Sequence, residues 1–288
     1  VFSVGVEEYI HEKTPRDFPR ATTRGQFDIE RVEEPRLDAG SLLPLRVVDD
    51  IYEVTLDEDE TSTSYGVAGG LEDVIEEEPD ETVVFVHGWL ANDRASLGRM
   101  SMMRYSLREN GYDGAIVGFT WDTDEVAHRW KLGRRISERN GPKLAQFVHD
   151  YKEETGSDVR LVSNSLGARV VLEAARSLYA SDAYDAVDSM SMMGAAVDSD
   201  SVALDGRYGK AVKEAIGEVH NYWISHDGIL NQQYRLIELT KALGGAGAEG
   251  DTPPNYHDHR VSYVPDHYSF YRPGKGCVRK VIADWNDE

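Results

Sequence analysis

Residues 160–174 read RLVSNSLGARVVLEA, and this stretch sets the expectation for the whole chain. Its first part is the short apolar run of a buried strand, and its last part has the apolar spacing of a helix. Ser165 stands between them, among the small residues Ser163, Gly167 and Ala168. A strand that turns directly into a helix strains the turn residue and leaves its side chain clear of both elements. The stretch therefore predicts a serine nucleophile at a helix N-terminus, where free N–H groups favour developing negative charge. A serine- and glycine-rich loop without a catalytic role is the alternative.

The composition is that of one acidic globular chain. Its 288 residues, 40% of them apolar, suit one large α/β domain with a substantial core. It has 52 acidic against 31 basic residues, and a net charge of −21 argues against nucleic acid or anionic lipid as partner. Of the basic residues 22 are arginine, and the acidic ones are dispersed. An acidic, lysine-poor surface is typical of proteins from salt-loving archaea, where salt screens the repulsion; an ordinary acidic protein is the alternative.

Composition also argues against a membrane-spanning protein and against a protein held by disulfides or a cysteine-bound metal. The chain contains no apolar run of about 18 residues, so we predict no transmembrane segment. Cys277 is the only cysteine, which rules out an intrachain disulfide and a cysteine metal cluster.

Strand-like runs alternate with helical patterns along the chain, which predicts an α/β fold with a doubly wound, mostly parallel sheet and helices on both faces. We expect an extended N-terminal arm at residues 1–44 and a single domain at 45–288. Strands are expected at 45–48, 51–56, 82–86, 115–120, 159–164, 187–194, 219–225 and 260–264. Helices are expected at 71–75, 96–110, 126–155 with a break at Gly141-Pro142, 166–180, 206–217, 230–243 and 274–285.

Polar residues that could complete a catalytic site follow the later strands. Asp227 comes after the 219–225 run, and His267 comes after the last run. Ligand sites in such sheets lie at the carboxyl ends of the strands, so both can approach Ser165. A buried carboxylate is needed to orient a histidine base and to stabilise its imidazolium. We predict Ser165 as nucleophile, His267 as base and Asp227 as acid, with Asp198 as the alternative acid.

These motifs resemble the α/β-hydrolase superfamily. Residues 163–167 resemble its G-x-S-x-G nucleophile elbow, with Ser163 in place of the first glycine, and the order serine, aspartate, histidine is the superfamily's order. His87-Gly88-Trp89 resembles its His-Gly oxyanion motif. The resemblance implies an oxyanion hole formed by the backbone N–H of Leu166 and that of Trp89 or Leu90. His87 itself is interpreted as structural.

A narrower resemblance covers the chain from about residue 82 to its end. Residues 119–155 with the elbow, 140–145 and 265–268 resemble an esterase-like branch found in halophilic archaea. Residues 14–28 resemble the mature N-termini of members exported by the twin-arginine route. The resemblance implies hydrolysis of an ester-like bond and export with a leader removed before Val1; a cytoplasmic location is the alternative.

The remaining histidines are interpreted as structural. His257 and His259 precede the expected last strand, and His220 and His226 lie within or beside another. The run His257-Asp258-His259 could suggest a metal, but no second ligand cluster supports one, so we predict neither metal nor cofactor.

Two functions of different class follow. The first is a serine esterase or lipase-type hydrolase acting on a small-molecule or lipid-like ester, with residues 228–256 as a possible lid. The second is a catalytically idle hydrolase scaffold used for binding or surface assembly. The sequence does not determine the oligomeric state.

Overall fold

The computed structural model describes residues 18–27, 63–123, 130–184 and 186–287, together with the backbone of 30–31 and 54–55. The strand expected at 45–48 and most of the expected arm lie outside these residues. Of the expected strand at 51–56, only β3 (Val54–Thr55) is described, and it pairs with β2 (Glu30–Arg31).

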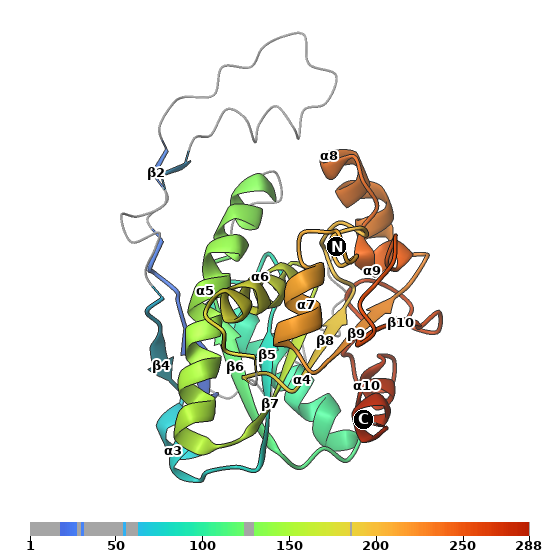
Figure 1. The fold of residues 1–288 in the computed structure, drawn as a ribbon. Coiled ribbons are helices and arrows are strands. Elements are labelled where there is room, and N and C mark those ends of the chain that lie inside the picture. The colour runs from blue at the N-terminus through green and yellow to red at the C-terminus, as the bar shows by residue number, and fades with distance from the viewer. Residues whose placement is uncertain are drawn as a thin grey trace.

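An eight-stranded sheet forms the centre of the molecule, in the order β10-β9-β8-β7-β5-β6-β1-β4 (Figure 1). All neighbouring pairs are parallel except β1 with β4. This confirms the α/β fold with a mostly parallel sheet. The strands are β1 (Arg20–Thr22), β4 (Gly66–Ala68), β5 (Glu81–Val86), β6 (Ala115–Thr120), β7 (Asp158–Asn164), β8 (Ser189–Met193), β9 (Glu218–Trp223) and β10 (Tyr256–Arg260).

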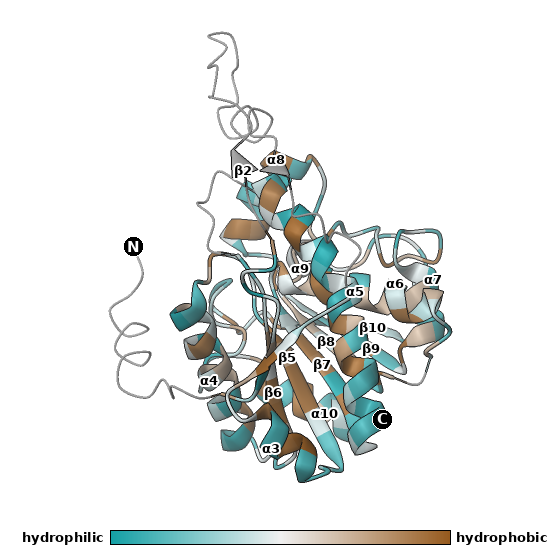
Figure 2. Cartoon of the chain, turned by 90° about the vertical axis from the view of Figure 1, so that its left-hand side faces the viewer, coloured by the Kyte–Doolittle hydropathy of each residue, from teal (hydrophilic) through white to brown (hydrophobic). Residues whose placement is uncertain are grey.

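Helices cover both faces of the sheet. The face covered by α5, α6 and α7 and the face covered by α4 and α10 each carry a separate apolar cluster. The central strands are mostly apolar (Figure 2), as burial on both faces requires. The helices are α3 (Leu71–Glu76), α4 (Asp93–Glu109), α5 (Trp130–Thr155), α6 (Gly167–Ala180), α7 (Gly209–Ala215), the π-helix η1 (Ile229–Tyr234), α8 (Arg235–Glu238), α9 (Leu243–Ala246) and α10 (Val278–Asn286).

The last strand is displaced from its predicted position. It runs over Tyr256–Arg260 rather than 260–264, in register with Val219–Trp223 of β9. A polar His-Asp-His sequence can form a strand here because β10 is an edge strand with only one neighbour. Val261 and Val264, which carried the prediction, are buried in the turn that follows.

Three further expectations are corrected. Residues 20–22 of the expected arm form β1, which lies between β6 and β4 in the sheet. Helix α5 does not break at Pro142, which lies inside it. The helix expected over 230–243 ends near Leu239, whose φ of 59° takes the chain out of helical geometry.

Candidate active site

Ser165 occupies a sharp turn between β7 and α6. Its φ is 54°, a left-handed value that is unfavourable for a serine and matches the strained turn predicted from the sequence. Its N–H donates to the Met193 carbonyl at 3.0 Å, and its carbonyl accepts from the Ala196 N–H at 3.0 Å. The loop after β8 therefore holds the strained turn from both sides.

Two glycines make the turn sterically possible. A Cβ on Gly167 would lie 2.5 Å from the Val86 carbonyl oxygen, and one on Gly88 would lie 2.9 Å from the Ser165 Cβ. Both distances are too short for real side chains. The end of β5 can approach the start of α6 this closely only because these positions lack side chains.

The structure brings Ser165, His267 and Asp227 into one hydrogen-bonded chain. Ser165 Oγ lies 2.9 Å from His267 Nε2, and His267 Nδ1 lies 2.7 Å from Asp227 Oδ2. An ionised carboxylate can only accept, so Nδ1 carries the ring proton and Nε2 faces the serine as an acceptor. Asp227 is fully buried and His267 nearly so, which shields the contact between them from water, while Ser165 is partly exposed.

The Asp227 carboxylate is oriented by the backbone that follows it. Its Oδ1 accepts from the N–H groups of Ile229 at 3.0 Å and Leu230 at 2.9 Å, at the start of η1. The neighbouring His226 donates from Nε2 to the Val264 carbonyl at 2.9 Å. That bond joins the loop after β9 to the loop that carries His267.

The loop after β5 and the start of α6 carry the backbone N–H groups that were predicted as oxyanion donors. Within the described part of the chain, the N–H groups of Trp89, Leu90 and Leu166 have no protein acceptor. Leu90 has a φ of 56°, a second strained residue beside the site. The predicted donors therefore remain free for a ligand, and Trp89 and Leu90 both stay candidates.

Arg99 of α4 fixes this loop, and the sequence analysis did not identify it. Its guanidinium donates to the carbonyls of Gly88 at 3.0 Å, Trp89 at 2.9 Å and Leu90 at 3.1 Å. In a planar trans peptide the N–H points away from the C=O. Carbonyls turned towards Arg99 therefore turn the N–H groups of Trp89 and Leu90 to the opposite side. An arginine on a helix carries no local signal of such a role.

His87 is structural, as interpreted from the sequence. Its ring is fully buried, stacks on Trp121, and donates from Nδ1 to the Gly88 carbonyl at 2.9 Å. Burial, reinforced by the Arg24 charge, holds the pKa of the His87 imidazole well below its ordinary value. The ring is therefore neutral and supports the loop without acting as a base.

Asp198 does not reach His267 in this structure. Its Oδ1 accepts from the Tyr234 hydroxyl at 2.6 Å. It also lines a separate cavity of about 300 Å³ between α5, α6 and the loop before α7, with Arg134, Glu138 and Arg169. The position beside His267 Nδ1 is taken by Asp227.

The segment expected to be a lid begins directly after Asp227. Tyr234 is buried, while Leu236 and Leu239 on or beside α8 are 61% and 64% exposed. Glu238 accepts from Trp130 and, at 2.8 Å, from Arg134, so α8 is tied to the start of α5. These contacts lie beyond the carboxyl ends of the strands, and the lid stays a prediction.

The sequence from residue 68 to residue 231 matches the model of a family described as alpha/beta hydrolase of unknown function (DUF900). That match covers more than half of the chain and contains Ser165 and Asp227. The chain belongs to this alpha/beta hydrolase family. Among curated proteins, none matches it. Within the described residues, no helix of this hydrolase is long and apolar enough to cross a membrane.

Several solved structures are similar to parts of this chain at low identity. An uncharacterized Bacillus cereus protein is 13% identical with a TM-score of 0.42, over 72% of this chain and 58% of its own. A Trichoderma reesei cutinase in complex with a phosphonate inhibitor is 19% identical with a TM-score of 0.35, over 48% and 60%. A Bacillus licheniformis lipase is 16% identical with a TM-score of 0.41, over 72% and 91%. The hydrolase thus spans less than two thirds of the first two chains, and these likenesses bear on neither substrate nor mechanism.

Proposed function

We propose that this protein is a serine hydrolase that cleaves a carboxylic ester through an acyl-enzyme. The observation that carries the proposal is the chain of contacts from Ser165 Oγ to His267 Nε2 and from His267 Nδ1 to Asp227 Oδ2, at 2.9 and 2.7 Å. The first distance suits proton transfer from a nucleophile to its base, and the second suits a hydrogen bond that orients the base. Family membership supports a hydrolytic reaction but does not specify it.

The proposed reaction has two steps. Ser165 Oγ attacks the ester carbonyl while His267 Nε2 takes the hydroxyl proton, and His267 then passes that proton to the departing alkoxide. In the second step water loses a proton to His267 and attacks the acyl group, which releases the acid and restores Ser165. Asp227 keeps the Nδ1 proton in place and stabilises the imidazolium in both steps.

Negative charge on the carbonyl oxygen is stabilised by backbone donors. The N–H of Leu166, at the start of α6, is one proposed donor, and the N–H of Trp89 or Leu90 is the other. The dipole of α6 adds to this stabilisation because its N-terminus faces the nucleophile. No step requires a metal or a cofactor. A small-molecule or lipid-like ester is the substrate class that this chemistry suits.

A fluorophosphonate probe tests the proposal directly. We expect the probe to label the wild-type protein at Ser165, and p-nitrophenyl esters of increasing acyl length to be hydrolysed in molar salt. Ser165→Ala should abolish labelling and lower kcat by at least about 10³-fold. Asp227→Asn should lower kcat less than Ser165→Ala does, because it impairs the orientation of the base but leaves the nucleophile in place.

One matched control variant helps to separate this proposal from a catalytically idle scaffold. Ser163→Ala removes a buried hydroxyl two residues from Ser165 that has no hydrogen-bond partner among the described residues. This variant should keep its labelling and its kcat. Absence of labelling and of esterase activity in a folded wild-type protein would overturn the proposal, and the scaffold hypothesis would then stand.

A further inference from the structure

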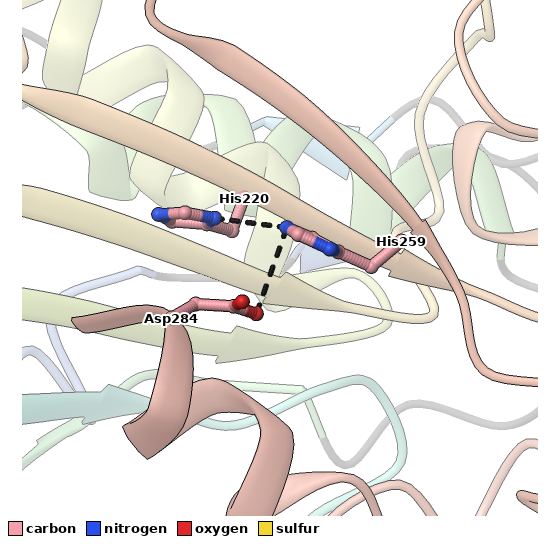
Figure 3. Close-up of side chains that lie close together, drawn as sticks. All are labelled: His220, His259 and Asp284. Atoms are coloured by element: carbon pink, nitrogen blue, oxygen red, sulfur yellow. Dashed lines mark hydrogen bonds and ion pairs between the residues drawn. The ribbon is translucent and has the colours of Figure 1, made fainter. Parts of the chain in front are cut away.

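Three potential metal ligands meet on the face of the sheet covered by α10, on elements distant in sequence (Figure 3). His220 lies on β9, His259 on β10 and Asp284 on α10. His220 Nδ1 lies 2.9 Å from His259 Nε2, which lies 3.6 Å from Asp284 Oδ2. All three ligand atoms lie within 4.8 Å of one another. From the sequence, His259 was expected just before the last strand and was interpreted as structural, not as a partner of His220 within the sheet.

The register of the two strands creates the arrangement. β9 pairs with β10 so that His220 lies opposite His257 and Tyr222 opposite His259. Residues two apart on a strand share a face, so all four rings lie on the same side of the sheet. The rings of His220 and His259 stack at 5.2 Å, and those of Tyr222 and His259 at 4.9 Å. This stacking holds the imidazoles with their nitrogens turned towards each other.

The carboxylate is also held in place. Asp284 accepts from the Tyr222 hydroxyl at 2.7 Å and pairs with Lys280 one turn earlier on α10. An outer hydrogen bond of this kind orients a ligating carboxylate in metal sites. In the metal-free protein the Lys280 ammonium neutralises the Asp284 carboxylate. We therefore expect it to compete with a bound cation.

Two of the three ligand distances are close to those around a small divalent ion, and the third pair, His220 and Asp284, lies within 4.8 Å. Two nitrogens bound tetrahedrally to zinc at about 2.0–2.1 Å lie about 3.3 Å apart, so the rings need to separate by only a few tenths of an ångström from 2.9 Å. The nitrogen–oxygen distance of 3.6 Å already fits. In the metal-free protein one of the facing nitrogens must donate a proton to the other; a metal ion replaces that proton.

We propose that His220, His259 and Asp284 bind one divalent transition metal ion of the zinc class. Two imidazoles and one carboxylate suit Zn²⁺ or Co²⁺ better than the oxygen-seeking Mg²⁺ or Ca²⁺. Bound there, the ion joins the edge strand β10 and the C-terminal helix α10 to β9. The site is separate from Ser165, because His220 lies in the body of β9 whereas Asp227 follows its carboxyl end.

Cobalt provides the test, because its visible absorption reports ligand number and geometry. We expect untagged, chelator-treated protein to bind one Co²⁺ per chain with a Kd in the micromolar range or below, with tetrahedral absorption bands that Zn²⁺ displaces. Zn²⁺ should raise the Tm, because an ion bound only by the folded state stabilises it. His259→Ala and Asp284→Asn should each weaken Co²⁺ binding by at least about 100-fold.

Two controls and one gain-of-binding variant make the result decisive. His257→Ala removes a ring that stacks on His220 but bonds to Glu218, and it should leave Co²⁺ affinity unchanged. His267→Ala should also leave it unchanged. Lys280→Met should tighten binding, because it removes the competing ammonium, and this result does not depend on the ligand variants being folded.

Several results would overturn the proposal. The first is a wild-type protein that does not bind Co²⁺ below about 100 μM. The second is binding that survives both His259→Ala and Asp284→Asn. The third is binding that is lost only in His267→Ala, and the fourth is no gain of affinity in Lys280→Met. Loss in His267→Ala alone would place the ion at the proposed triad. These outcomes are independent of fluorophosphonate labelling, so the metal site and the proposed hydrolase activity can fail separately.

Discussion

Arg99 shows how a single side chain can orient the backbone N–H donors of other residues. It holds three successive carbonyls of the loop after β5, and two of these three peptide planes carry the N–H groups of Trp89 and Leu90. Arg99→Met should therefore lower kcat for p-nitrophenyl esters by about 10- to 100-fold with little change in KM, since the loss falls on the oxyanion. Arg99→Lys should recover part of the loss.

Arg104 on the same helix provides the control for this prediction. Its guanidinium lies 4.6 Å from the centre of the Phe18 ring and makes no bond to the loop. Arg104→Met should keep kcat, although it can lower the Tm. Equal effects of the two substitutions on kcat would show that Arg99 acts through general stability.

His87 predicts a pH dependence of stability. Its folded-state pKa lies well below the ordinary 6.5, so below that pH the unfolded chain binds a proton that the folded chain does not. Stability is then lost as pH falls from 6.5, by up to about 1.4 kcal/mol per pH unit. Urea unfolding at pH 7 and pH 5 should show a smaller loss in His87→Asn than in the wild type.

The exposed His149 is the matched control for the pH measurement. Its side chain is 47% exposed, and His149→Asn should leave the wild-type pH dependence in place. A loss between pH 7 and pH 5 that is equal in the wild type and in His87→Asn would contradict the assignment.

At the residue scale, the sequence predicted which groups meet but not what holds them. The elbow pattern and Asp227 were visible because each follows a recognisable strand, whereas His267 was placed by its order in the chain and by a last strand that lies a few residues earlier than predicted. Asp198 was the alternative acid for the same reason, and the structure places it against Tyr234 instead. Arg99 could not be predicted, because its role depends on the distance between α4 and the loop after β5.

At the scale of elements, the Gly141-Pro142 pair illustrates how one signal can have two meanings. It predicted a helix break, but in α5 the glycine provides a close contact with α6. A Cβ on Gly141 would lie 2.2 Å from the Glu173 Cβ. Gly141→Ala should therefore lower the free energy of unfolding by about 1–3 kcal/mol through overpacking, despite the higher helix propensity of alanine.

Gly228 provides the comparison. It has a helical φ of −68°, and a Cβ there would meet nothing within 4 Å. Gly228→Ala should leave the free energy of unfolding within about 0.5 kcal/mol of the wild type. If Gly141→Ala lowered the free energy of unfolding as little as Gly228→Ala, this result would contradict the close contact between α5 and α6.

The elements that were not predicted from the sequence were missed for one physical reason. The apolar strands β5, β6 and β7 are recognisable because both of their faces are buried. The edge strand β10 exposes polar side chains, and the short strand β1 is stabilised by pairing with β6. Neither has a local apolar pattern, so both depend on the tertiary structure.

At the scale of the whole molecule, the charge predicts a response to salt. A net charge of −21 produces self-repulsion that is screened at high ionic strength and unscreened at low. The Tm should fall as NaCl is lowered from about 2 M to 0.05 M, where the Debye length exceeds 10 Å. Sucrose at matched osmolality should not replace the salt. A Tm that is independent of salt would contradict the halophilic interpretation.

The dual bonding of Asp227 limits how this fold can be re-engineered. One carboxylate oxygen serves His267 and the other accepts the first N–H groups of η1. Any segment transplanted here to change substrate preference must therefore keep residues 227–230 intact and begin after Leu230. A junction two residues earlier would replace the residues whose backbone N–H groups orient the carboxylate, and a proline there would remove a donor outright.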